Sequence, residues 1–176
     1  SPNIDSLKRI LVAEKNPEVR LQSLLIYCEQ VQGEDTALVN RYCEELVMLA
    51  TASGKQLIHA NALRIAGSQA NINADYPKAF AFLGRAIDLS GKIPSVEGRT
   101  ALAGSLLSMG AVYHGSGDFE PALSLYLESE SIYMRLHDNE GLIRVYSSLG
   151  DLYDKLQQPQ KRKIYNEKAF KLASAT

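Results

Sequence analysis

Apolar residues recur at intervals of three and four along most of this 176-residue chain. Examples are Leu57, Ala60, Leu63, Ile65 and Ala66, and Leu123, Leu125, Tyr126, Ile132 and Tyr133. This interval places apolar side chains on one face of an α-helix, and no segment keeps the strict alternation of a β-strand. The pattern predicts an all-α protein with helices near residues 4–14, 17–32, 36–53, 56–73, 76–90, 96–115, 119–136, 140–157 and 160–174.

Residues that favour helix ends separate these runs. Asn16-Pro17, Asp75-Tyr76-Pro77 and Asp118-Phe119-Glu120-Pro121 each combine a side chain that accepts from first-turn amides with a proline that fits the first turn. Four glycines follow apolar runs, where a left-handed residue commonly ends a helix: Gly33, Gly54, Gly91 and Gly117. The short intervals between runs predict that neighbouring helices are antiparallel.

Three segments share one internal spacing. The clearest reads Leu106-x-x-Met109-Gly110-x-x-Tyr113, followed by Ala122-x-x-x-Tyr126. A later segment reads Tyr146-x-x-Leu149-Gly150-x-x-Tyr153, and an earlier one reads Leu63-x-x-Ala66-Gly67-x-x-Ala70, followed by Ala79-x-x-x-Leu83. Gly67 and Gly110 are 43 residues apart, and Gly110 and Gly150 are 40 apart.

This spacing resembles the tetratricopeptide repeat (TPR), in which Leu-Gly and Tyr on a first helix are followed by Ala-x-x-x-Phe on a second. The resemblance implies that Gly67, Gly110 and Gly150 allow close helix packing, with Tyr113, Ala122 and Tyr153 completing the contact. The units exceed the usual 34 residues and resemble the long TPR units of bacterial signalling proteins. The implied fold is a right-handed α-solenoid of antiparallel helical hairpins, a TPR-like superhelix.

One TPR-like domain over residues 1–176 is therefore expected. Its predicted parts are a lead-in helix (1–15), a degenerate hairpin (16–54) and three repeats (55–92, 95–137 and 139–176). Because the chain begins at Ser1 and stops just after an amphipathic run, we expect it to be a fragment of a longer protein.

The resemblance also implies that the first helix of each pair lines a concave groove. Stepping around these helices from each glycine gives a stripe of small, polar and charged side chains, which suits an extended peptide and a carboxylate. The predicted partner-binding residues are Asn61, Arg64, Ser68, Asn71, Ser108, His114, Arg144, Ser147, Ser148, Asp151 and Lys155.

Three functions remain open for such a fold. The first is a non-catalytic scaffold that binds a protein or peptide in the groove, as the sensory or regulatory region of a bacterial signalling protein. The second is a receptor in which a small ligand or peptide changes the superhelix and switches an attached output domain. The third is self-association through the last helix, which carries Ile164, Ala169, Phe170 and Leu172.

Composition and motifs argue against several other classes. Lys and Arg number 19 and Asp and Glu 20, so the chain lacks the basic excess of a nucleic-acid-binding protein. Apolar stretches are too short to insert into a membrane. His59, His114 and His137 are far apart, with no metal-ligand spacing, and no nucleophile motif is present. We expect no catalysis, cofactor or metal.

Cys28 and Cys43 are 15 residues apart. They are too few for a disulfide framework, and they either face each other across a hairpin or are simply small buried side chains. Whether they pair, and whether the protein is cytoplasmic or periplasmic, both stay open at this point.

Overall fold

The computed structural model describes residues 3–31 and 36–175. Over these residues the chain forms nine α-helices and no strand: α1 (Ile4–Ala13), α2 (Pro17–Gln30), α3 (Thr36–Ala52), α4 (Gln56–Ile72), α5 (Tyr76–Gly91), α6 (Val96–Ser116), α7 (Phe119–Leu136), α8 (Asn139–Lys155) and α9 (Pro159–Ala175). The all-α prediction is confirmed, and the helix ends agree with the sequence pattern to within about two residues wherever both ends are described.

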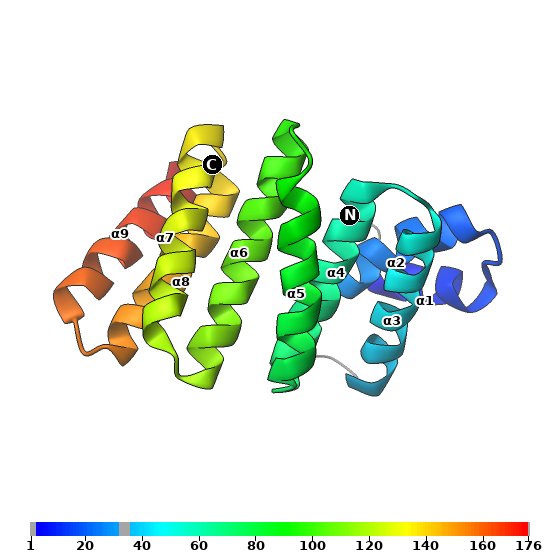
Figure 1. Cartoon of the computed structure of the whole chain (residues 1–176), viewed down its shortest axis with the longest axis horizontal. Coiled ribbons are helices and arrows are strands. Elements are labelled where there is room, and N and C mark those ends of the chain that lie inside the picture. The colour runs from blue at the N-terminus through cyan, green and yellow to red at the C-terminus, as the bar shows by residue number, and fades with distance from the viewer. Residues whose placement is uncertain (1–2, 32–35, 176) are drawn as a thin grey trace.

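The helices form a single row, with α1–α3 at one end and α8–α9 at the other (Figure 1). Each helix packs on its neighbours in sequence. In addition, the backbone of α4 approaches those of α2 and α6, and α6 approaches α8. Within the described residues, α3, α5, α7 and α9 show no such backbone approach to one another, and they meet through long side chains, as in the ion pairs Lys78–Glu44 and Lys168–Glu130. The even-numbered helices therefore form the inner side of an α-solenoid, and the odd-numbered helices from α3 onward form its outer side.

Several helix starts follow the predicted chemistry. The Asn16 side chain accepts from the amides of Glu18 and Val19, and Asp75 accepts from the Lys78 amide. The prediction that Asp118 caps α7 in the same way is wrong. Its carboxylate accepts from the Ser116 hydroxyl at 3.0 Å instead, because that hydroxyl is only two residues away.

The predicted glycine ends are right at two positions. Gly54 and Gly117 have positive φ angles, +67° and +91°, and Gly117 ends α6 in the left-handed conformation. Gly91 is instead the last residue of α5, without a positive φ, and Lys92 caps that helix in a right-handed conformation. Gly33 lies outside the described residues.

The buried core is continuous only between neighbours. The first cluster is formed by helices α1 through α4 and is centred on Leu24, Tyr27 and Leu46. A small cluster is formed by α4, α5 and α6. The third is formed by α6 through α9 around Tyr126 and Leu149. A solenoid buries its apolar surface in this way, because each unit covers only the next one.

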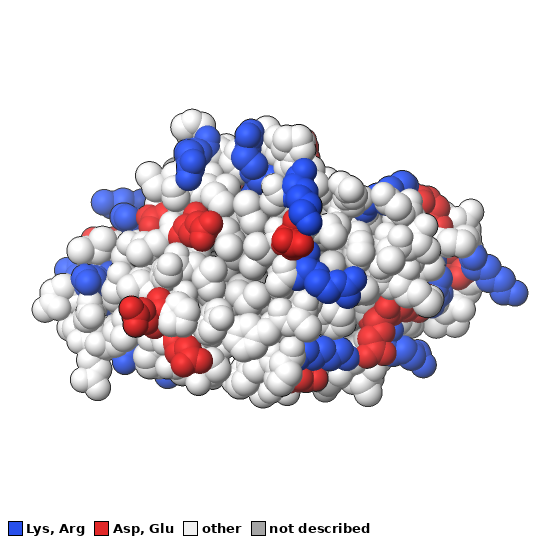
Figure 2. Space-filling view, viewed as in Figure 1, with Lys and Arg blue, Asp and Glu red and all other residues white. Residues whose placement is uncertain are grey.

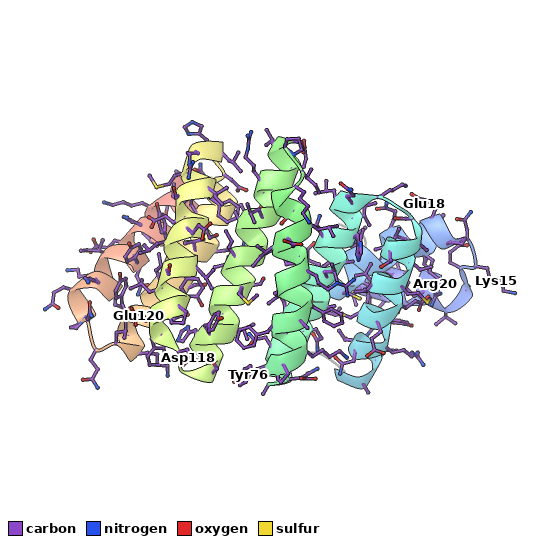
Figure 3. The ribbon with its side chains drawn as sticks, in the orientation of Figure 1. Lys15, Glu18, Arg20, Tyr76, Asp118 and Glu120 are labelled. Carbon is purple, nitrogen blue, oxygen red and sulfur yellow. The ribbon has the colours of Figure 1, made fainter. Side chains whose placement is uncertain are left out.

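The N-terminal end is held by a half-buried arginine. Arg20 of α2 (Figure 3) donates from Nη1 to the Leu11 carbonyl of α1 at 2.6 Å and from Nη2 to Glu45 of α3 at 2.8 Å. The hydrogen bond from Arg20 holds the pKa of the Glu45 carboxyl below its usual value. One guanidinium thus links three helices.

Charged residues of both signs are interspersed on the face shown in Figure 2 and form no continuous single-sign surface there. None of the helices, as far as the chain is described, is both long enough and apolar enough to span a bilayer.

Candidate functional site in the concave groove

A pocket of about 500 Å³ opens on the inner side of the solenoid. Four helices meet there with a tyrosine from a fifth. The pocket is lined by Leu25, Ile26 and Glu29 of α2, Leu57, Asn61, Arg64 and Ile65 of α4, Val96, Glu97, Thr100, Ala101 and Gly104 of α6, Tyr133 of α7 and Arg144 of α8. It combines apolar side chains from α2, α4 and α6 with two arginines, Arg64 and Arg144.

Gly104 makes the centre of this pocket possible. A Cβ added to Gly104 would lie 3.3 Å from the Tyr133 hydroxyl and 3.4 Å from Arg64 Cδ. The missing side chain leaves room for Tyr133 of α7, an outer helix, to place its buried hydroxyl directly beneath the inner surface. Tyr133 and Arg64 therefore both pack against the same glycine, Gly104.

Arg144 approaches the same hydroxyl from α8. Its Nη2 lies 3.5 Å from Tyr133 Oη, and its Cζ is 5.9 Å from the ring centroid. Burial raises the pKa of Tyr133, an effect that the charges of Arg144 and Arg64 partly oppose. The phenol is thus neutral at ordinary pH, and this fully buried side chain supports Arg144 from beneath the pocket.

The two arginines differ in their partners. Arg64 Nη2 pairs with Glu29 Oε1 of α2 at 2.6 Å, and the Arg64 side chain is only 16% exposed, against 55% for Glu29. Arg144 is exposed and has no carboxylate within ion-pair distance in the described part of the chain. The pocket thus holds one neutralised cation and one available cation.

Serine hydroxyls predicted to face a partner are largely engaged within the protein. The Ser68 hydroxyl bonds to Ser108 at 3.0 Å across α4 and α6, and Ser148 bonds to the phenol of Tyr126. Ser147 is exposed and donates to the Ile143 carbonyl of its own helix at 3.0 Å. These hydroxyls form hydrogen bonds within the protein, and so they stabilise the floor of the groove instead of facing a partner.

The other predicted residues lie outside this pocket. The His114 ring packs edge-on against Phe119 at 5.8 Å, and burial lowers its pKa while the charge of Asp151 opposes that shift. Lys155 also acts electrostatically on His114. Asn71 lies beside Gly115 of α6, one turn beyond Ser68. Of the predicted partner-binding residues, only Asn61, Arg64 and Arg144 share the main pocket.

The packing residues lie between paired helices. A Cβ at Gly67 would be 2.6 Å from Leu83, and one at Gly110 would be 2.6 Å from Tyr126, with fully buried Ala122 alongside. Gly150 faces Asn166 of α9. The two remaining aromatic residues make ring contacts, Tyr113 with Phe80 at 4.7 Å and Tyr153 with Tyr165 at 5.5 Å.

Sequence reasoning missed Glu29, Tyr133 and the apolar side chains from α2. Tyr133 belongs to a second helix, where the repeat pattern predicts core packing. The available signal was Gly104, because a residue without a side chain on the groove face leaves space that a large residue from behind can fill. No sequence signal pointed to Glu29, since its position depends on the curvature of the solenoid.

Three consecutive pairs of antiparallel helices, each with a glycine at the crossing, give the chain a TPR-like helical repeat fold. No family model and no curated protein matches the chain. Among solved structures, a Rap protein complexed with Competence and Sporulation Factor aligns with a TM-score of 0.82 and 16% identity, over 97% of this chain and 48% of that one. This chain thus spans about half of the Rap protein.

Two further solved structures share the fold. BtubC from P. vanneervenii aligns with a TM-score of 0.70 and 15% identity, over 98% of this chain and 70% of that one. A putative kinesin light chain from Podospora anserina, with nearly identical TPR-like repeats, aligns with a TM-score of 0.64 and 13% identity, over 98% of this chain and 86% of that one. At these identities the similarity shows the fold alone.

Proposed function

We propose that this chain is a non-catalytic scaffold that binds an extended peptide or protein segment in its concave groove. One observation carries the proposal. Arg64 of α4 and Arg144 of α8, distant in sequence, line the same pocket of about 500 Å³ on either side of the Tyr133 hydroxyl. Two guanidinium groups in one pocket suit an anionic group.

The chemistry of the pocket favours a peptide with a carboxylate beside an apolar side chain. Arg144 supplies donors for the carboxylate, and Leu25, Leu57 and Val96 supply apolar surface. Hydrogen bonds between charged groups contribute about 1.5–3 kcal/mol each, enough for one such residue to select among peptides.

The comparison with the Rap protein supports a regulatory role. That protein has the same fold over 97% of this chain and was solved with Competence and Sporulation Factor bound. Together with the resemblance to long TPR units of bacterial signalling proteins, this favours a sensory or regulatory region in a bacterial signalling protein.

The test is capture on an array of short peptides in which each acidic residue is present or replaced by its amide. We expect the wild-type chain to prefer acidic peptides and the double variant Arg64→Glu/Arg144→Glu to lose that preference. The matched control is Arg99→Glu/Arg135→Glu, which changes the charge equally outside the pocket. Equal capture by both double variants, with unchanged circular dichroism, would contradict the groove as the site.

A second candidate, a ligand-responsive receptor, is favoured by the Arg64–Glu29 pair. A ligand carboxylate that binds Arg64 must displace Glu29, which removes an ion pair between α2 and α4. The first hairpin would then shift, and a shift of that kind could switch an attached output domain. Small-angle scattering with and without the best acidic peptide tests this candidate, and unchanged dimensions would exclude it.

Self-association through α9 stays a prediction. Phe170 and Ile164 are 73% and 51% exposed, which favours it. However, α9 carries five basic residues and one acidic residue, so two copies side by side would repel. A molecular mass by light scattering that is independent of concentration would exclude it.

A further inference from the structure

A cleft of about 350 Å³ lies between α3 and α5, with α4 as its floor, away from the concave groove. Glu44 and Lys78 line it and pair with each other at 2.8 Å. Gln69 also lines it, 1% exposed, and within the described residues its amide nitrogen and oxygen have no hydrogen-bond partner. The cleft thus contains unused hydrogen-bonding capacity for a small polar molecule.

Cys43 of α3 lines the same cleft and is 3% exposed. Cys28 of α2 is fully buried, does not line the cleft, and forms a hydrogen bond with the Cys43 thiol. Both thiols are free. Both alternatives left open by the sequence hold: the cysteines are small buried side chains, and their thiols meet across the first hairpin, but only Cys43 adjoins the cleft.

The surroundings also make the two thiols unequal. The hydrogen bond from Cys28 lowers the pKa of Cys43, while burial and the charge of Glu44 act in the opposite direction and the charge of Lys78 adds a smaller lowering. The same hydrogen bond and burial raise the pKa of Cys28. Since the thiolate is the nucleophile, Cys43 is the thiol prepared to react first.

We propose that Cys43 is a modification site for small hydroperoxides, and that Cys28 is the resolving thiol that converts the oxidised Cys43 to a disulfide. The oxidant has to be small because Cys43 is exposed only through the cleft. A bulky disulfide could not align its sulfur atoms with the thiol there.

The chemistry balances in two steps. The Cys43 thiolate attacks one peroxide oxygen, so that an S–O bond forms, the O–O bond breaks, and the other oxygen leaves as hydroxide or alkoxide and takes a proton. The sulfur of Cys28 then attacks the sulfenic sulfur of Cys43. An S–S bond forms, the S–O bond breaks, and the departing hydroxide takes the Cys28 proton to give water.

The experiment treats the full chain with hydrogen peroxide and counts free thiols after denaturation. We expect the count to fall from two to none, with a loss of two hydrogen atoms in the intact mass and a Cys28–Cys43 peptide in a non-reducing digest. A reductant should restore both thiols. The oxidised chain should also unfold at higher temperature, because the new link joins α2 to α3.

Two single variants test which thiol reacts first. In Cys28→Ser, Cys43 should accumulate as a sulfenic acid that dimedone captures. In Cys43→Ser, Cys28 should stay reduced at the same peroxide concentration, because it does not line the cleft. Circular dichroism verifies that each variant is folded.

Two results would overturn the proposal. The first is that both wild-type thiols stay free at peroxide concentrations that oxidise the denatured chain. The second is that dimedone labels Cys28 in folded Cys43→Ser as fast as it labels Cys43 in folded Cys28→Ser. The wild-type measurement does not depend on either variant folding.

Discussion

The α6–α7 and α8–α9 hairpins each place a glycine of the first helix against the second helix, but the residues that meet this glycine differ. In α6–α7, Gly110 packs against Tyr126, and Ala122 and Tyr133 are fully buried. In α8–α9 the equivalent glycine, Gly150, faces Asn166, and α9 has no buried residue. The glycine therefore sets how closely two helices approach, whereas the residues of the second helix decide how much apolar surface the contact buries.

Contacts of another kind hold α9 in place. The Tyr165 ring stacks on Tyr153 at 5.5 Å, and Lys168 Nζ lies 4.7 Å from the Tyr165 ring centroid and 3.5 Å from Glu130 of α7. A single half-buried ring and a partly exposed ion pair stabilise less than a fully buried apolar face. In a solenoid, where each unit depends on its neighbour, α9 should be the first helix to open.

The largest effect is expected at the internal crossing. In Gly110→Leu the first added carbon already lies 2.6 Å from Tyr126, so the two helices must separate, which costs about 1–3 kcal/mol or more. Gly115→Leu is the control, because a Cβ there would meet its nearest atoms at 3.4 Å. Urea unfolding followed by circular dichroism measures both, and equal losses would mean that Gly110 is not the packing glycine.

A smaller loss is expected at the last crossing. In Gly150→Ala the new methyl group meets the end of the Asn166 side chain, which can rotate away, and alanine favours the helix by about 1 kcal/mol. Gly110→Ala meets a buried ring that cannot move. We expect Gly150→Ala to lower the free energy of unfolding by less than Gly110→Ala does. The reverse order would show that α9 is packed as firmly as α7.

The smallest effect concerns alkaline pH. Burial, followed by the charge of Glu130, raises the pKa of Tyr165 to about 12. The folded state thus holds this proton more firmly than the unfolded state, whose tyrosine pKa is about 10. Stability from the neutral phenol is complete below the unfolded pKa and is lost as the pH rises toward 12.

Tyr165→Phe removes this titration and keeps the ring. We expect the variant to lose less stability than the wild type between neutral and alkaline pH, as measured by urea unfolding at each pH, with tyrosinate absorbance as the monitor of titration. An identical alkaline loss in both proteins would mean that Tyr165 is not protected in the fold.

The sequence was sufficient for features that depend on a local period. Helix positions and the glycine crossings follow from intervals of three and four and from the repeat spacing. The cap at Asp118 could not be predicted correctly because two nearby groups, the Ser116 hydroxyl and the helix amides, compete for one carboxylate.

The candidate site was only partly predictable for a different reason. The stripe of groove residues was assigned helix by helix, but which of them meet depends on how the helices curve together. Arg64 and Arg144 meet in one pocket, whereas Ser68 and Ser108 bond to each other. Glu29 and Tyr133 enter from helices that no repeat motif assigns to the site.

The inner helices approach one another closely through their backbones, whereas the outer helices meet only through long side chains, and this difference has a mechanical consequence. Because α4 touches α6 and α6 touches α8, and packed side chains resist compression, narrowing the groove is opposed from the start. Flattening the solenoid meets less steric resistance, since within the described chain α5 and α7 have no close backbone approach to compress. The groove should therefore open more easily than it closes. A bulky occupant should widen the groove, whereas a slender occupant should not draw its walls together.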